Sequence, residues 1–150
     1  MPSSLAKEFK TILVKETEAL SIGSAFTDFM GPVISRSAFD RVAKYVTDAK
    51  TAPEISVLAG GICDDSVGYF IRPTVIESSD PKSRFMSEEV FGPFVCLYVY
   101  DDAEFGPKLF QLIDETTEYA LTGAIFSKSR AAIIQATDEL RFSAGNFYIK

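Results

Sequence analysis

The sequence predicts an α/β protein in which helices cover both faces of a mostly parallel sheet. The strongest indication is the alternation of strand and helix patterns over residues 95–149. A parallel pair of strands needs a long crossover between them, and a helix is its usual form. VCLYVY at 95–100 is also apolar on both faces, as in a buried parallel strand. Since 150 residues with 47% hydrophobic side chains suffice for one core, we predict a single domain over 1–150.

Two helices and two short strands are predicted before this alternation. Apolar residues recur at helical spacing over 3–20, and Ser35 is a suitable N-cap for a second helix that ends near Lys50. Apolar and β-rich stretches at 55–61 and 68–78 predict strands, and SEEV at 87–90 has the composition of one helical turn. The later helices are predicted at 103–117 and 129–140, separated by a strand at 121–126 and followed by one at 145–149. Pro107 is compatible with a helix only in its first turn.

Composition excludes several classes of function. The net charge is −6 without any basic block, which argues against nucleic acid as a partner. The chain contains no apolar run long enough to span a membrane, and its N-terminal residues lack the pattern of a targeting segment. With no histidine and two cysteines outside any metal-binding spacing, neither a zinc site nor histidine chemistry is expected.

SEEVFGPFV at 87–95 raises three interpretations. Glu88 and Glu89 could be an acid/base pair, could favour the first turn of a helix, or could belong to a ligand site. A catalytic pair is the poorest of the three, because neighbours in sequence do not face each other on a helix. The residues alone leave the other two interpretations open.

Four motifs occur in a recognisable order: FMGPVIS at 29–35, GYFIRPTVI at 68–76, MSEEVFGPFV at 86–95, and YALTGAIFS with AGNFYI at 119–127 and 144–149. Together they resemble the C-terminal part of the catalytic domain in the NAD(P)-dependent aldehyde dehydrogenase superfamily. GGICDDSVGYF, LTGAIFS and AGNFYI resemble most closely its L-glutamate γ-semialdehyde (Δ1-pyrroline-5-carboxylate) dehydrogenase branch. The resemblance extends over essentially the whole chain.

The resemblance implies that SEEVFGPFV belongs to an NAD site. Glu89 would accept hydrogen bonds from the ribose hydroxyls of the nicotinamide half, and Phe91 would pack near the nicotinamide. Glu88 would be a structural or solvated acid. Asn146, Phe147 and Tyr148 would approach the aldehyde tunnel, although they also fit alternating positions of a C-terminal strand.

The resemblance also implies that the catalytic groups are not in this sequence. The family's nucleophilic cysteine lies in a G-Q-x-C stretch that this chain lacks. The family's general-base glutamate and the segment that binds adenine are also missing from this sequence. Cys63 is followed by two aspartates that disfavour a thiolate, and Cys96 is expected to be a core residue. No catalytic residue is therefore assigned, and NAD is expected to bind weakly.

Two functions follow as expectations. The first is a fragment of an NAD-dependent glutamate-semialdehyde dehydrogenase of proline catabolism, inactive alone; the alternative is a non-catalytic binding or signalling protein that reuses the fold. In either case an exposed sheet edge and apolar surface predict a homo-oligomer, most simply a dimer. By resemblance the location is the cytoplasm or the mitochondrial matrix.

Overall fold

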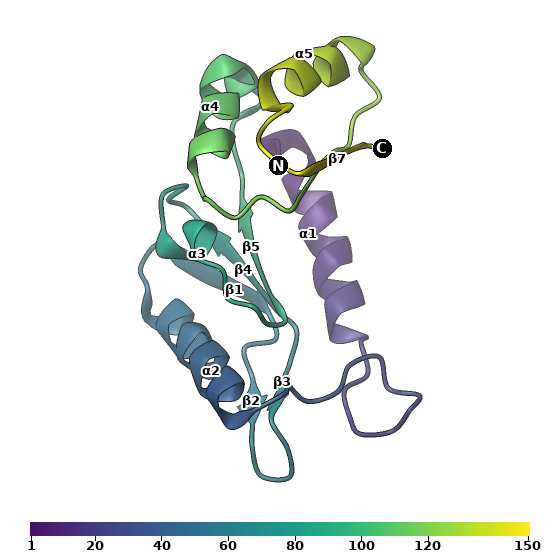
Figure 1. Cartoon of the computed structure of the whole chain (residues 1–150), viewed down its shortest axis with the longest axis vertical. Coiled ribbons are helices and arrows are strands. Elements are labelled where there is room, and N and C mark those ends of the chain that lie inside the picture. The colour runs from purple at the N-terminus through teal and green to yellow at the C-terminus, as the bar shows by residue number, and fades with distance from the viewer.

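A computed structural model describes all 150 residues and contains five α-helices, one 3-10 turn and seven strands (Figure 1). The helices are α1 Ser3–Glu18, α2 Arg36–Thr51, α3 Arg84–Ser87, α4 Pro107–Glu115 and α5 Arg130–Leu140, with the 3-10 turn η1 at Asp102–Glu104. The strands are β1 Ile55–Ala59, β2 Cys63–Asp64, β3 Phe70–Ile71, β4 Thr74–Ser78, β5 Phe94–Tyr98, β6 Thr122–Ile125 and β7 Asn146–Ile149. The α/β class predicted from the sequence is confirmed.

The strands form three small sheets of mixed direction. In the largest sheet, of order β1-β4-β5, β4 pairs antiparallel with β1 and parallel with β5. The β2–β3 pair is antiparallel, and the β6–β7 pair is parallel. The sheet is therefore less parallel than predicted. The reason lies in residues 60–73, where the β2–β3 excursion returns the chain beside β1 without a helical crossover.

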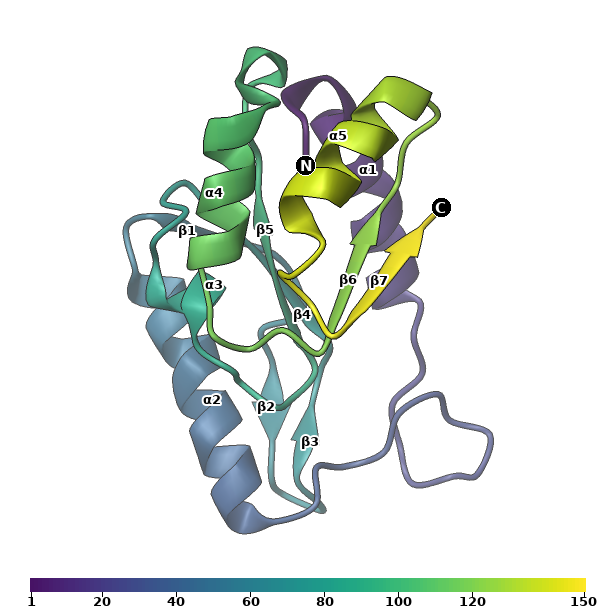
Figure 2. The same ribbon diagram turned by 45° about the horizontal axis from the view of Figure 1, so that its top comes forward.

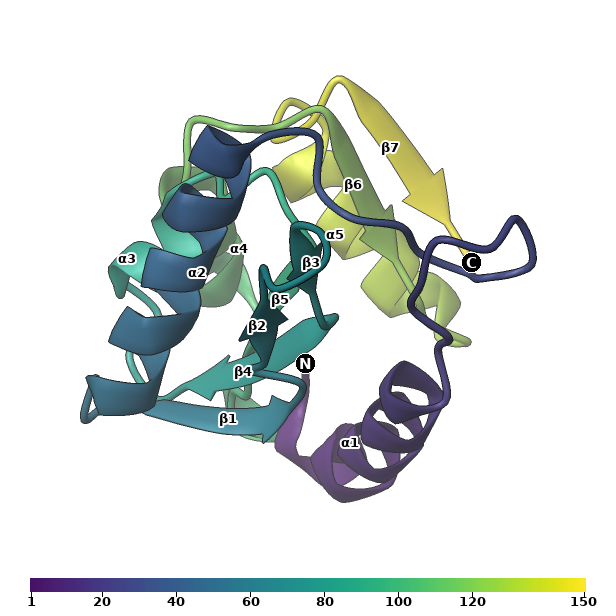
Figure 3. The same ribbon diagram turned by 90° about the horizontal axis from the view of Figure 1, so that it is seen from below.

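Helices α1 and α2 lie on different sides of the central strand β4 (Figure 3). Successive strand residues point to opposite faces. Ile76 belongs to the buried cluster that α2 contributes to, whereas the neighbouring Glu77 forms a 2.7 Å ion pair with Lys10 of α1. Helices therefore cover both faces of this sheet, as predicted.

The main core lies between α2 and the three-stranded sheet. Its eight buried residues are Phe39, Val42, Tyr45, Ala49, Ile71, Ile76, Phe85 and Val90. Helix α2 begins as predicted, because the Ser35 hydroxyl accepts a hydrogen bond from the backbone N–H of Ala38. This helix supplies half of the cluster and is the platform on which the candidate site is built.

A second, smaller cluster lies between α4, α5 and the β6–β7 sheet (Figure 2). Phe110, Ala136 and Leu140 are buried there, and Ile125 and Phe147 pack against them. Pro107 is the first residue of α4, the one position where its missing N–H costs nothing. The predicted helix over 103–117 is accordingly split into η1 and the shorter α4.

Much apolar surface remains uncovered. Leu5, Phe9 and Ile12 belong to the apolar residues at helical spacing on α1, yet each is about half exposed, at 58%, 47% and 53%. Strand β5 lies at the edge of its sheet, where only Met1 to Ser3 pair with its end through Tyr98 and Tyr100. None of the helices has the length and hydropathy needed to cross a bilayer.

Candidate functional site

The candidate site is the loop Glu88–Gly92, which we call the 88–92 loop, between α3 and β5. Helix α3 ends at Ser87, and Glu88 is already extended, with φ −88° and ψ 144°. The prediction of a helical turn over 87–90 is therefore wrong, and so is the interpretation of the acids as its first turn. The turn forms earlier, around Phe85, because that aromatic side chain is buried in the main core.

Glu89 and Phe91 project from the 88–92 loop on either side of Val90. Val90 is buried in the main core, whereas Glu89 is exposed and Phe91 is 79% exposed. Phe91 has φ 53° and is the one non-glycine residue with a positive φ. Such a conformation is disfavoured for a bulky side chain and costs about 1 kcal/mol or more, so surrounding contacts must maintain it.

Gly92 is required by close packing against α2. A Cβ atom at this position would lie 2.7 Å from Cγ2 of Val42, which is fully buried. The Arg41 side chain, one residue earlier on α2, donates hydrogen bonds of 3.3 Å and 3.4 Å to the carbonyl oxygens of Val90 and Phe91. The backbone on both sides of Phe91 is therefore held against α2.

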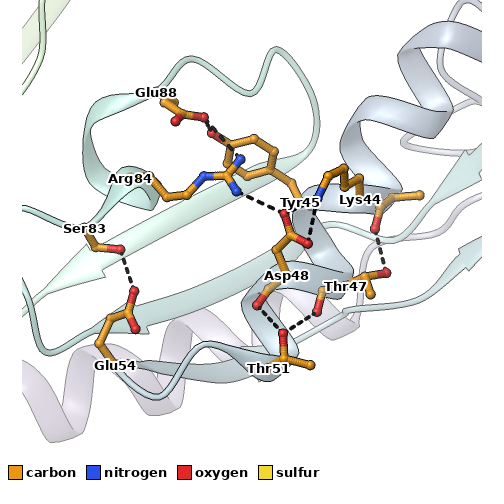
Figure 4. A network of polar contacts seen from close by, with 10 residues as sticks. Lys44, Tyr45, Thr47, Asp48, Thr51, Glu54, Ser83, Arg84 and Glu88 are labelled. Carbon is orange, nitrogen blue, oxygen red and sulfur yellow. Dashed lines mark hydrogen bonds and ion pairs between the residues drawn. The ribbon is translucent and has the colours of Figure 1, made fainter.

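Glu88, whose side chain is 52% exposed, takes part in a polar network with α2 and α3 (Figure 4). Its carboxylate accepts hydrogen bonds from the hydroxyl of Tyr45 and, at 3.3 Å, from Arg84. Arg84 also donates a 3.0 Å bond to Asp48, to which Lys44 is bound as well. These hydrogen bonds hold the pKa of Asp48 below its usual range, with the bond from Lys44 as the largest cause. The two acids therefore have different environments: the Glu88 carboxylate accepts hydrogen bonds from Tyr45 and Arg84, whereas Glu89 has no hydrogen-bond partner.

This network was not foreseen from the sequence. Arg41, Tyr45 and Arg84 occur in ordinary helical patterns, and their partners in the 88–92 loop are four to fifty residues away. The spacing of Arg41 and Tyr45, four residues apart on one face of α2, was the only local signal that they share a neighbour.

The C-terminal candidates lie on a different sheet. Asn146 and Tyr148 of β7 are exposed, whereas Phe147 points toward the second cluster and packs against it. These three residues alternate as in an ordinary strand, but Ile149, on the same side as Phe147, is 49% exposed. A substrate contact by Asn146, Phe147 or Tyr148 remains a prediction, and the packing of Phe147 makes it the weakest of the three.

Neither cysteine is activated. Burial raises the pKa of the Cys63 thiol, and the opposing effect of Lys50 is smaller. Burial also raises the pKa of Cys96 to about 11, so both groups are protonated thiols near neutral pH. The cause at Cys63 is desolvation rather than the following aspartates, because Asp65 pairs with Arg36 at 2.5 Å and Asp64 binds the backbone of Ser66.

The remaining acidic pair, Asp101 and Asp102, accepts hydrogen bonds from backbone N–H groups. Asp101 caps η1 in a reciprocal capping box with Glu104, and Asp102 accepts a 3.2 Å hydrogen bond from the backbone N–H of Ser4 at the start of α1. Both acids therefore act as helix caps. No three His, Cys, Asp or Glu side chains gather in a metal-binding arrangement.

The free groups of the 88–92 loop suit a nucleoside ligand. An ionised carboxylate accepts hydrogen bonds from both hydroxyls of a vicinal diol, and an exposed aromatic ring offers a face for a flat heterocycle. Glu89 and Phe91 present these two groups two residues apart on a backbone that α2 fixes.

The α/β fold and the 88–92 loop are those of one protein family. The model of the aldehyde dehydrogenase family matches residues 1–150, and the chain belongs to this family. Among curated relatives it is similar to the mitochondrial Δ1-pyrroline-5-carboxylate dehydrogenases of Homo sapiens (43% identical) and Bos taurus (42%). Each alignment covers 99% of this chain and 27% of the relative, so the chain spans about a quarter of the length of these enzymes.

Solved structures of aldehyde dehydrogenases contain a region with the same fold as this chain. The Δ1-pyrroline-5-carboxylate dehydrogenase of Mycobacterium tuberculosis bound with NAD superimposes with a TM-score of 0.88 at 36% identity, over 99% of this chain and 26% of that one. Betaine aldehyde dehydrogenase of Staphylococcus aureus in complex with NAD⁺ gives 0.83 at 28% identity, over 99% of this chain and 29% of that one. The family resemblance noted in the sequence is thereby confirmed.

Proposed function

We propose that this chain provides the nicotinamide-ribose half of the cofactor site of an NAD-dependent dehydrogenase for L-glutamate γ-semialdehyde. The observation that carries the proposal is the difference between the two exposed acids: Glu88 accepts hydrogen bonds from Tyr45 and Arg84, whereas Glu89 has no hydrogen-bond partner and lies beside the exposed Phe91. Glu89 would hold the ribose hydroxyls and Phe91 would lie near the nicotinamide. NAD, when bound, supplies the hydride acceptor.

The chain alone is proposed to lack turnover. Aldehyde oxidation in this family needs a thiolate, and the two thiols available, Cys63 and Cys96, have raised pKa values. Contacts to one half of the cofactor, without those to the adenine half, support only weak binding of NAD. The substrate class rests on similarity to the Δ1-pyrroline-5-carboxylate dehydrogenases.

An NMR titration with NAD tests this proposal. Saturation transfer from the protein should reach the nicotinamide and its ribose more strongly than the adenine, and Glu89→Gln or Phe91→Ala should weaken binding. Asp114→Asn, which changes an acid on α4, is the matched control. NADH formation with glutamate semialdehyde is measured in parallel. Turnover by the chain alone, or binding that is indifferent to both variants, would refute the proposal.

Self-association is the second property we propose, with a two-fold dimer as its simplest form. Twenty large apolar side chains are exposed, including Val95 on the edge strand β5. An apolar pocket of about 300 Å³ lies beside this strand and is lined by Cys96, Tyr98 and Leu109, among others. Light scattering over a concentration series should reveal a dimer, and a monomer at high concentration would contradict this.

The alternative is a non-catalytic protein that acts through the same exposed surface. The partly uncovered face of α1 favours it, because Leu5, Phe9 and Ile12 form an apolar stripe that is about half exposed. Binding of NAD through Glu89 would favour the first function. By similarity to mitochondrial relatives, we propose the mitochondrial matrix or the cytoplasm as the location.

A further inference from the structure

Glu88 has side-chain hydrogen bonds that a solvated acid would not make. Glu88 accepts hydrogen bonds from the Tyr45 hydroxyl and from Arg84, and both donors are themselves fixed (Figure 4). Tyr45 is buried and meets the rings of Phe85 and Phe94 edge-on at 5.5 Å and 6.1 Å. Its hydroxyl therefore has little freedom to follow the loop.

Arg84 is fixed from two further directions. Its guanidinium lies over the Tyr45 ring, 4.4 Å from the centroid, and donates to Asp48 of α2 at 3.0 Å. A planar cation held by a ring on one side and by a carboxylate on another keeps its orientation. Glu88 is thus attached to the buried Tyr45 and to a surface arginine that stacks on the same ring.

The strained residue lies three positions after this anchor. Phe91 has φ 53°, and a left-handed conformation at a bulky residue persists only where its surroundings determine it. The segment from Glu88 to Phe91 is held at both ends, by the Tyr45 hydroxyl at one and by the Arg41 guanidinium at the other. Release of the first anchor removes the attachment at the Glu88 end and leaves the segment held by Arg41 and by the buried side chain of Val90.

We propose that Glu88 is a positioning residue: bound by Tyr45 and Arg84, it sets the backbone so that Glu89 and Phe91 face the cofactor. This inference rests on the proposed function for the identity of the ligand. The geometry that it assigns to the loop is independent of any ligand and is measurable in the chain as it stands.

The first measurement follows the conformation of Phe91 by NMR without ligand. A positive φ brings the amide and α hydrogens of one residue close together and gives a strong cross-relaxation signal between them. Glu88→Ala should weaken this signal at Phe91, whereas Glu88→Gln, which still accepts from Tyr45, should largely keep it. Tyr45→Phe removes the donor and retains the ring, so it should reproduce the effect of Glu88→Ala.

The second measurement is the Kd for NAD in the same variants. Loss of a hydrogen bond to a charged group predicts about tenfold weaker binding for Glu88→Ala and Tyr45→Phe, with Glu88→Gln near the unmodified chain. Glu115→Ala is the matched control, because this exposed acid accepts a 2.8 Å hydrogen bond from Gln111 on α4. It should change neither the Phe91 signal nor the Kd.

The outcomes separate the two proposals. If the unmodified chain binds no NAD, the proposed function fails, while the Phe91 signal still decides whether Glu88 sets the loop. If Glu88→Ala and Tyr45→Phe both leave that signal unchanged, the positioning role is overturned, even where NAD binds through Glu89. An equal effect of Glu115→Ala would overturn it as well.

Discussion

Replacement of Gly92 by alanine tests how tightly the 88–92 loop is packed on α2. The new Cβ atom would lie 2.7 Å and 3.2 Å from the two γ carbons of Val42. Nonpolar carbon atoms prefer separations of about 3.5–4.0 Å, so the overlap with the nearer atom is on the order of 1 Å. Val42 is fully buried and cannot move into solvent. The backbone at Gly92 is outside the left-handed region, so the expected cost is steric.

Insertion of a methyl group into a packed core costs about 1–3 kcal/mol. For a chain of this size, each kcal/mol corresponds to about 2–4 °C in Tm, so Gly92→Ala should lower Tm by about 2–12 °C. Urea unfolding followed by circular dichroism gives the same quantity as a free energy. Gly31→Ala is the control, because the nearest atom to its Cβ, the carbonyl oxygen of Gly23, is 4.0 Å away.

A double variant isolates the contact. Val42→Ala removes both γ carbons and costs about 1.5–3 kcal/mol by itself, but it also makes room for the methyl group at position 92. Val42→Ala combined with Gly92→Ala should therefore be less destabilised than the sum of the two, by about 0.5 kcal/mol or more. Strict additivity, or a Gly92→Ala variant as stable as Gly31→Ala, would refute the reasoning.

Three further outcomes are expected. Ile76→Ala empties a fully buried position and should destabilise the chain by about 2–5 kcal/mol in urea unfolding, whereas a loss below 1 kcal/mol would mean that the core lies elsewhere. Hydrogen bonds from Ser4 hold the pKa of Asp102 below its ordinary value of 3.8. The folded state therefore binds this proton less readily than the unfolded state, so the stabilisation is complete above that value and is lost as the pH falls below it. Asp102→Asn should flatten the acid limb of a stability-against-pH curve, and an unchanged limb would count against the cap. Cys96, with a pKa raised to about 11, should be alkylated by iodoacetamide on the order of 100-fold more slowly at pH 8 in the folded chain than in urea. Equal rates would contradict its burial.

The order and type of most elements were determined by the sequence, because the signals are local. The Ser35 cap and the apolar face of α2 identify that helix within a few neighbouring residues, and Pro107 marks the first turn of α4. The motif SEEVFGPFV is also local, and its residues indicated the aldehyde dehydrogenase family. The match over the whole chain confirms that the protein belongs to this family.

The tertiary structure decided what these local signals could not. The antiparallel pairing of β1 with β4 depends on the path of residues 60–73, and the exposure of one face of α1 depends on what else packs there. The roles of Glu88 and Glu89 were also undecided, since the two acids are chemically equivalent in the sequence. Their roles differ because of Tyr45, forty-three residues before Glu88, since only folding brings the hydroxyl of this buried residue to one carboxylate and leaves the other without a partner.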